Sequence, residues 1–202
     1  MSDRVKQKRD ARRRELLDIA LSLFMEMGYE KTSIRSLATR AGGDIGLIYH
    51  YFHSKNEIYE AALAYFNEIF LEKVSHIVDA YATPFETKLD SIFNLVDTSL
   101  AAYRPMKTEG NNDIMLLLLS RTLASLVPVF EKLISSYLTQ QGIELDKSNQ
   151  LLVSNYMLYG FSGIIHTQGD MAMAQRYDFA KRMLYGTLAQ LSEMDTFPGD
   201  NS

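Results

Sequence analysis

The sequence predicts an all-α protein in which a three-helix helix-turn-helix domain precedes a larger helical domain. Apolar residues recur at spacings of three and four along most of the chain, the period of helices that bury one face. Glycine and proline interrupt this spacing at intervals, and no stretch alternates polar and apolar residues as a strand does. With 202 residues and 47% apolar content, the chain can bury a sizeable core, as one large domain or as a small one joined to a larger one.

The composition excludes several classes of protein. There is no cysteine, so disulfides, thiolate metal sites and cysteine nucleophiles are excluded. The chain has no run of 18 uninterrupted apolar residues, and its start, MSDRVKQKRDARRR, is too charged for a secretory signal. A cytoplasmic location is the default expectation.

Charge is divided unevenly along the chain. Residues 1–55 hold 11 Lys and Arg against 7 Asp and Glu, whereas residues 56–202 hold 10 against 18, which together give the net charge of −4. A basic head on an acidic body suggests that the head binds nucleic acid and that the body stays away from it. A basic start can also be a solubilising tail, and charge alone does not separate these two interpretations.

The first element predicted is a supporting helix. From Arg12 to Met27 the apolar residues follow helical spacing, and Gly28 comes next as a natural helix stop. The apolar positions on its buried face are Leu16, Leu17, Ala20, Leu23, Phe24 and Met27.

Two short helices joined by a glycine turn follow it. Thr32 or Ser33 can cap the first short helix, and the pair Gly42-Gly43 ends it. Asp44 can cap the second, which is expected over residues 45–52. This spacing predicts a helix-turn-helix. The positions assigned to packing in the two short helices are Ile34, Leu37, Ala38, Ile48 and Phe52.

Six further helices are predicted after this turn. Ser54 is a candidate N-cap for a helix that reaches about Tyr81, with Glu57 at the position that a capping box requires. Breaks containing proline or glycine separate the remaining segments. Their expected ranges are about 85–103, 112–124, 127–141, 147–167 and 172–193.

The helix-turn-helix becomes specific at two stretches of sequence. TSIRSLATRAG (32–42) followed by GLIYHYFHSKNEIY (46–59) resembles the TetR family of one-component bacterial transcription regulators, and the match covers roughly residues 10–60. The resemblance implies a homodimer with a DNA-binding domain, here residues 1–55, and a helical effector-binding and dimerisation domain, here residues 56–202. Most members are repressors that a small-molecule effector releases from a palindromic operator. No cofactor or metal is implied.

The resemblance assigns DNA contacts position by position. It implies that the hydroxyls of Thr32 and Ser33 touch backbone phosphate as they cap the first short helix, and that Lys55 binds a phosphate at the start of the helix that Ser54 caps. The remaining positions carried over are Ile45, Gly46 and Leu47 as base readers, Tyr49 and His50 as residues facing DNA, and Tyr51 near the DNA backbone.

The helix expected over residues 45–52 carries the base readers and is called the reading helix here. It departs from the family in its charge and in the turn that precedes it. The turn reads AGGDI where the family commonly has Ala-Gly-Val-Ser, and there is no Lys or Arg between Ala41 and Ser54. Phosphate contacts position a protein and base contacts specify the site, so cations outside the reading helix can supply affinity. We expect them on a flexible N-terminal arm and on the flanking helices, at Arg4, Lys6, Lys8, Arg9, Arg12, Arg13, Arg14, Arg35, Arg40 and Lys55.

Base reading could then depend on apolar contacts. Ile45, Leu47 and the ring of Tyr49 suit thymine methyl groups, and Gly46 permits close approach. Arginines of a flexible arm favour the narrow minor groove of A/T-rich DNA. These features predict an A/T-rich palindrome.

Asp44 has two possible roles in this setting. As an N-cap it stabilises the third helix, but its carboxylate repels a nearby phosphate. It could instead accept a hydrogen bond from a cytosine amino group.

The body of the chain is rich in Met, Tyr and Phe and predicts an effector cavity, since such cavities are mostly apolar with a few polar groups. The same residues could equally be ordinary core or interface residues. The residues that could line the cavity are Tyr103, Arg104, Met106, Met115, Tyr156, Met157, Tyr159, Phe161 and His166.

The last two predicted helices carry wide apolar faces with glycines that let helix backbones approach closely. They predict an isologous dimer interface, although an equally apolar pair could simply be core. The candidate interface residues are Tyr156, Gly160, Gly163, Ile164, Tyr177, Met183, Leu184, Thr187 and Leu191.

Two rival functions compete with this interpretation. An enzyme is disfavoured because His50 and His53 have no carboxylate or Cys to complete a metal site, and no phosphate-cradling glycine loop or serine-nucleophile motif occurs. The second rival is a protein-interaction or co-regulator module that keeps this fold but lacks sequence-specific DNA binding or needs a partner for it. The unusual turn at Gly43, Asp44 and Ile45 is the feature that supports this rival.

Overall fold

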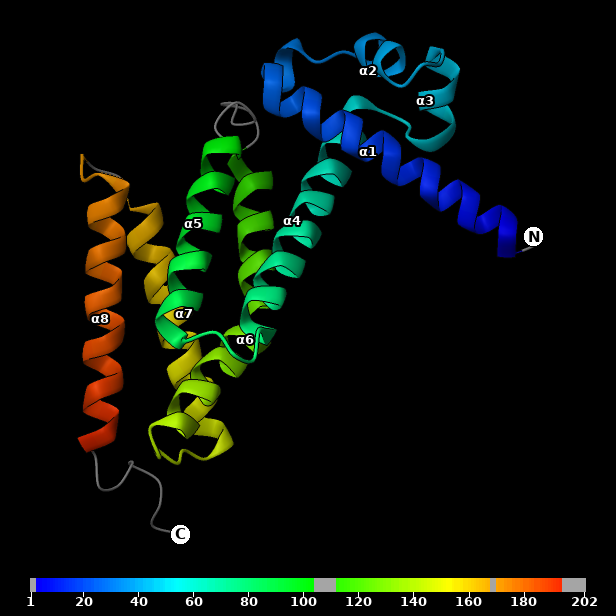
Figure 1. The fold of residues 1–202 in the computed structure, drawn as a ribbon. Helices are drawn as coiled ribbons and strands as arrows, with labels where there is room; N and C mark the ends of the chain where they lie inside the picture. Colours follow the sequence, from blue (N-terminus) through cyan, green and yellow to red (C-terminus); the bar gives the residue numbers. More distant parts are fainter. Residues whose placement is uncertain (1–2, 104–111, 168–169, 194–202) are drawn as a thin grey trace. The chain divides into compact units, whose positions relative to one another are not determined.

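A computed structural model describes residues 3–103, 112–167 and 170–193, and this part of the chain is helical with no strand (Figure 1). The fold class is therefore all-α, as the apolar spacing predicts. The helices are α1 (Asp3–Lys31), α2 (Ile34–Arg40), α3 (Ile45–Tyr51), α4 (Lys55–Asp79), α5 (Phe85–Tyr103), α6 (Asn112–Gln140), α7 (Lys147–His166) and α8 (Met173–Glu193).

The chain divides into two compact units. The first contains residues 1–73 and 96–122, and the second contains residues 74–95 and 123–202. The core of the first unit joins α1, α2 and α3 to the first turns of α4, where Ile58, Tyr59 and Leu63 are almost completely buried. The core of the first unit thus continues past residue 55. The predicted boundary between a DNA-binding domain, residues 1–55, and an effector-binding domain, residues 56–202, stays a prediction.

The supporting helix is longer than predicted. The structure begins α1 at Asp3, so the basic stretch expected to be a flexible arm is helical, which corrects that expectation. Residues 3–15 contain no Gly or Pro and consist mainly of strong helix formers, and Arg12 pairs with Glu15 at 2.5 Å one turn away. Local propensity therefore continues the helix beyond the apolar face that marked its predicted start.

The predicted stop at Gly28 is confirmed as a break in helical geometry. Gly28 has φ 78° and ψ 170°, a conformation that is open to glycine and costly for other residues. The Thr32 hydroxyl donates to the Gly28 carbonyl at 2.8 Å and so fixes the turn that leads into α2. Phe24, Tyr29 and Tyr59 form an aromatic cluster beside it, with ring centroids of Tyr29 and Tyr59 4.8 Å apart.

One predicted helix boundary is wrong. The break expected at Val127-Pro128 does not occur, because α6 runs through Pro128 as one helix. Proline removes one backbone donor, but Leu126 and Phe130 on either side are buried, and their packing offsets the lost hydrogen bond. The other predicted helices agree with α4, α5, α7 and α8 to within a few residues.

The second unit is held together by aromatic packing and by charged groups that satisfy helix ends. The Phe93 ring lies 4.8 Å from that of Phe161 and 5.1 Å from that of Tyr177, which joins α5 to α7 and α8. The buried Lys88 ammonium donates to the Val78 carbonyl at 2.7 Å, near the end of α4. This charge-assisted bond satisfies a carbonyl that the helix itself leaves unpaired.

Candidate DNA-binding surface and effector cavity

The start of α2 is fixed by hydroxyl groups. Ser33 is the N-cap: its Oγ accepts from the N–H of Ser36 at 3.0 Å, and the Ser36 Oγ accepts from the N–H of Ser33 at 3.0 Å. Ser33 is exposed, whereas Thr32 is 1% exposed and donates inward to Gly28. The structure therefore corrects the assignment of Thr32 as a phosphate contact, because its hydroxyl lies inside the core.

The turn before α3 depends on two glycines for different reasons. Gly42 has φ +67°, the left-handed region that favours glycine. Gly43 has ordinary φ, but a Cβ there would lie 2.6 Å from Cδ2 of Leu47. Leu47 folds back over Gly43 and is half-buried against the core, so it is placed as a packing residue rather than as a base reader.

Asp44 caps α3 as predicted. Its Oδ1 accepts from the N–H of Leu47 at 2.9 Å. Gly46 faces this carboxylate, since a Cβ at Gly46 would lie 3.1 Å from the same Oδ1. The negative charge is thus held at the positive end of the helix dipole.

The rest of α3 separates into a packed side and a free side. Ile48 and Phe52 are 2% and 1% exposed, which confirms their predicted packing. Ile45 and Tyr49 are 38% and 53% exposed. Gly46 and His50 are exposed as well, whereas Tyr51 is half-buried with its ring edge-on to His50 at 5.0 Å. The free side is a ridge of aromatic and apolar groups without a cation.

Lys55 lies at the start of α4 in a defined position. Its Nζ is 4.1 Å from the ring centroid of Tyr29 and donates to the Glu30 carbonyl at 3.4 Å. A cation–π contact and one hydrogen bond thus orient an ammonium that keeps further donors for an anion. Tyr29 was not among the predicted site residues, and its distance from Lys55 in the sequence gives no signal of the contact.

The α4 N-terminus is capped by a variant of the predicted capping box. The Ser54 hydroxyl accepts from the N–H of Glu57 at 3.1 Å, as expected for an N-cap. The Glu57 carboxylate accepts from the N–H of His53 at 2.6 Å and lies 2.9 Å from its Nδ1, instead of reaching the N–H of Ser54. These bonds from His53, the backbone one first, lower the pKa of Glu57 and keep it ionised.

Several predicted phosphate-binding cations are engaged within the first unit. Arg12 donates to the Ala41 carbonyl at 3.1 Å and pairs with Glu15, and Arg13 lies over the Phe52 ring at 5.2 Å. Arg4 and Arg35 are exposed.

Arg40 makes two bonds to the Glu26 carboxylate, at 3.2 and 3.0 Å. These bonds, followed by one from Ser22, lower the pKa of Glu26. Arg40 is therefore neutralised by its partner and contributes little free positive charge.

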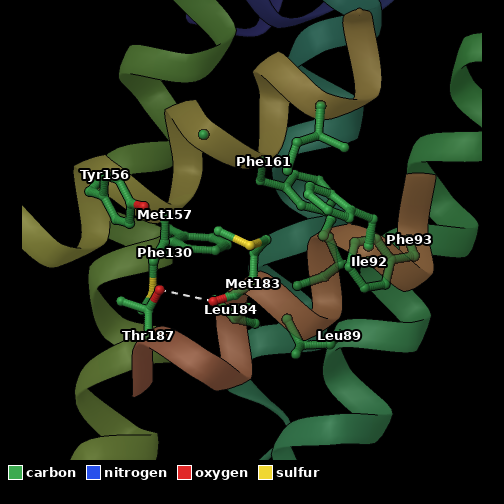
Figure 2. Close-up of a pocket in the computed structure, with 14 residues that line it drawn as sticks. Leu89, Ile92, Phe93, Phe130, Tyr156, Met157, Phe161, Met183, Leu184 and Thr187 are labelled. Carbon is green, nitrogen blue, oxygen red and sulfur yellow. Dashed lines mark hydrogen bonds between the residues drawn. The ribbon is translucent and has the colours of Figure 1, made fainter. Parts of the chain in front are cut away.

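An apolar cavity of about 290 Å³ lies in the second unit, between α5, α6, α7 and α8. Phe130, Phe161 and Met183 lie around the same space (Figure 2). The Thr187 hydroxyl, one of the polar groups drawn there, donates to the Met183 carbonyl at 2.8 Å. The cavity suits an apolar molecule, because it offers few polar partners.

The predicted effector residues are only partly reunited in this cavity. Tyr156, Met157 and Phe161 line it, whereas Tyr159 and His166 are exposed and do not. Arg104 and Met106 lie outside the described residues, as do the side chains of Tyr103 and Met115. Sequence reasoning left other lining residues out of the predicted set, since helical spacing does not distinguish a cavity wall from a core. These include Leu89, Phe93 and Phe130.

Four of the nine predicted interface residues on α7 and α8 are exposed, namely Tyr156, Gly160, Gly163 and Met183. Tyr156 is 61% exposed and Met183 is 46% exposed, and a Cβ at Gly160 or Gly163 would meet no atom within 4 Å. Leu191 is 7% exposed and belongs to the core of its own unit, which corrects its assignment to the interface. Tyr177 is half-buried and packs on Phe93. Gly160, Ile164, Leu184 and Thr187 border the cavity, so its mouth and the candidate interface share residues.

None of the helices in the part of the chain that the structure describes is long and apolar enough to cross a membrane.

Comparisons with known proteins agree with the geometry of the first unit. A family model described as bacterial regulatory proteins, tetR family, matches residues 16–62. The HTH-type transcriptional repressor KstR2 of Mycobacterium tuberculosis (strain CDC 1551 / Oshkosh) is 37% identical over 91 residues, which cover 45% of this chain and 45% of that protein. The alignment thus spans less than half of either chain.

Solved structures extend the likeness to both units. The transcriptional regulator from Cytophaga hutchinsonii ATCC 33406 has a TM-score of 0.66 at 13% identity and covers 91% of this chain and 98% of that one. The regulator FadR from Bacillus subtilis, in complex with stearoyl-CoA, has a TM-score of 0.54 at 18% identity and covers 85% and 97%. At these identities the likeness shows a shared fold. The sequence likeness to the tetR family of bacterial regulatory proteins thus covers the N-terminal part of this chain, residues 16–62.

Proposed function

We propose that the chain is a DNA-binding transcriptional repressor that acts as a homodimer on a palindromic operator and is released by a small-molecule effector. The observation that carries the proposal is the free side of α3. Ile45 and Tyr49 stay exposed although the same helix buries Ile48 in the core. A short helix that is anchored on one side and exposes aromatic and apolar groups on the other fits the major groove.

The surrounding groups support phosphate contacts on both sides of α3. Ser33 offers an exposed N-cap at α2, and Arg35 is exposed two residues farther along. Lys55 is oriented by Tyr29 at the start of α4. Phosphate contacts from these groups position α3, while Ile45, Gly46 and Tyr49 contact thymine methyl groups and His50 adds a hydrogen bond. Because the proposed base contacts are made to thymine methyl groups, we expect an A/T-rich operator.

The exposed surface of α7 and α8 supports the homodimer. Tyr156, Tyr159 and Met183 are large and exposed, and Gly160 and Gly163 leave room for a helix of a second copy. A patch of this kind is more apolar than a monomer's surface usually is. In a twofold dimer each α3 meets one half of a palindrome.

The cavity between α5 and α8 supports an apolar effector. Its lining of Phe93, Phe130 and Phe161 offers area to an acyl chain or a ring system rather than to a sugar or nucleotide. FadR from Bacillus subtilis, which shares the fold, was solved with stearoyl-CoA. An effector releases DNA only if it binds the DNA-incompetent state more tightly, with a typical coupling of about 1–3 kcal/mol.

A genomic-fragment selection with the purified full chain at fixed, near-physiological salt tests this proposal. We expect a palindromic, A/T-rich fragment to be enriched, with binding that falls steeply with salt. Tyr49→Ala should abolish enrichment while the protein stays folded, and Tyr81→Ala, at an exposed tyrosine of the second unit, should not change it. Absence of any enriched fragment would favour the rival function, a protein-interaction or co-regulator module.

A further inference from the structure

The helical form of the basic N-terminus places its charges in a definite pattern. Residues 3–11 are all exposed and continue α1 beyond the core of the first unit. Figure 1 shows this end of α1 projecting past α3. Side chains three and four residues apart share a helix face. The contacts that Arg12 and Arg13 make with α2 and α3 therefore show which way the side chains on the same faces of residues 3–11 point.

Two rows of cations continue from residues that touch the helix-turn-helix. Arg13 lies over the ring of Phe52, the C-cap of α3, and Arg9 and Lys6 follow it at spacings of four and three. Arg12 donates to the carbonyl of Ala41, the C-cap of α2, and Lys8 follows one turn away. These five residues form the basic face of the extension, and the acid that pairs with it is Glu15, at Arg12.

The opposite side of the extension has a different charge. Its row contains Asp3, Gln7, Asp10 and Arg14, at spacings of four, three and four. Five of the seven cations between residues 3 and 14 therefore lie on the side of α1 that contacts α2 and α3, whereas Asp3 and Asp10 lie on the other side. If the extension served only solubility, its charges could lie on any face of the helix, because solubility depends on the amount of charge and not on the face that carries it.

We propose that the basic face, residues Lys6, Lys8, Arg9, Arg12 and Arg13, is a rigid docking surface for the backbone of double-stranded DNA beside the segment that α3 reads. The proposal rests on the proposed function and adds a second contact region to it. The extension between residues 3 and 15 has only Val5 and Ala11 as apolar residues, too few for a membrane surface or an apolar protein groove.

The dimensions of the extension suit this partner. From Lys6 to Arg13 the helix rises about 10 Å, at 1.5 Å per residue, which spans about three base-pair steps of one DNA strand at 3.4 Å each. Arg13 and Arg12 are already fixed by Phe52 and Ala41, so Lys6, Lys8 and Arg9 are the members free to take phosphates. Such contacts add affinity without reading sequence.

The first test compares two arginines of the same helix on opposite faces. Arg9→Gln removes a charge from the basic face, and Arg14→Gln removes the same charge from the acidic side. Affinity of the full chain is measured by fluorescence anisotropy against salt, on the selected duplex and on a random duplex of equal length. We expect Arg9→Gln to reduce the slope of log affinity against log salt by about 0.9 per protomer on both duplexes, and Arg14→Gln to change it little.

The second test rotates the charges without changing them. One alanine inserted between Ala11 and Arg12 turns the outer segment by about 100° and brings Asp10 to the place of Arg9. The net charge and the core stay as they are. We expect at least a tenfold loss of affinity, whereas four inserted alanines return the basic row to within about 40° of its face and restore part of the binding.

Each outcome decides the proposal. Equal effects of Arg9→Gln and Arg14→Gln, or tolerance of the single inserted alanine, would overturn the docking surface while leaving the regulator intact, because charge would then act without a defined face. Wild-type protein that binds neither duplex with a steep salt dependence would overturn the proposed function and the docking surface together.

Discussion

The carboxylate of Asp44 accepts a hydrogen bond from the N–H of Leu47 at 2.9 Å, which places the only charge of the reading helix at its N-terminus. The bond satisfies one of the donors that a helix leaves unpaired at this end. It also explains why a helix without a cation begins with an acid: the carboxylate stabilises the N-terminus of α3 by accepting a backbone hydrogen bond.

Replacing Asp44 should separate this capping role from its effect on DNA. We expect Asp44→Ala to lower the free energy of unfolding by about 1 kcal/mol and Asp44→Ser to preserve it, because serine also caps helices. Both variants should bind random duplex DNA more tightly, since a carboxylate near phosphate is removed. Denaturant unfolding and anisotropy titrations measure the two effects. Weaker binding by Asp44→Ser would show that the carboxylate contacts DNA favourably.

Gly43 and Leu47 should behave as a coupled pair. A Cβ at Gly43 would lie 2.6 Å from Cδ2 of Leu47, so we expect Gly43→Val to destabilise the protein by about 1–3 kcal/mol through overpacking. In a Leu47→Ala background the same change should cost clearly less, because the clashing methyl group is gone. Additive free energies of unfolding in the four-member cycle would argue against this contact.

The ion pair between Glu26 and Arg40 should make stability depend on acid pH. The pKa of Glu26 is lowered from 4.5 in the folded protein, so its contribution is present above that pH and is lost as pH falls through the folded pKa. We expect Glu26→Gln to flatten the decline of stability below about pH 4.5. Arg40→Gln should flatten it to a similar extent, and the double variant should add nothing further. Chemical unfolding at several pH values measures this dependence.

Arg176 should be a major stabilising residue of the second unit. It is 8% exposed and donates to the carbonyls of Ile165, Thr167 and Met171, which closes the connection between α7 and α8. We expect Arg176→Met to cost about 3 kcal/mol, because the buried carbonyl of Ile165 and two partly buried carbonyls lose their donor.

Arg182 provides the matched control for that substitution. It pairs with Asp178 at 2.8 Å on the same helix, but both side chains are largely exposed. Arg182→Met should therefore change the free energy of unfolding by about 0.5 kcal/mol or less. Similar losses in the two variants, compared by thermal or denaturant unfolding, would contradict the role assigned to Arg176.

Local sequence determined most of the secondary structure. Helical spacing, the stop at Gly28 and the caps at Ser33, Asp44 and Ser54 were predictable because each depends on residues within one or two turns. Local reasoning erred at Pro128, where it treated a proline as an end. Burial of Leu126 and Phe130 on both sides decided the outcome there.

The tertiary structure decided which side chains remain free. Thr32 and Ser33 look alike in sequence, yet only Ser33 is exposed, because the Thr32 hydroxyl turns inward to Gly28. The pairing of Arg40 with Glu26 and the cation–π contact of Lys55 with Tyr29 join residues 14 and 26 positions apart, which no local pattern reveals. The sequence by itself thus determined the helices and the kind of domain they build. Packing between helices decided which hydroxyls and cations stay available for a partner, because burial and pairing depend on distances that only the folded chain sets.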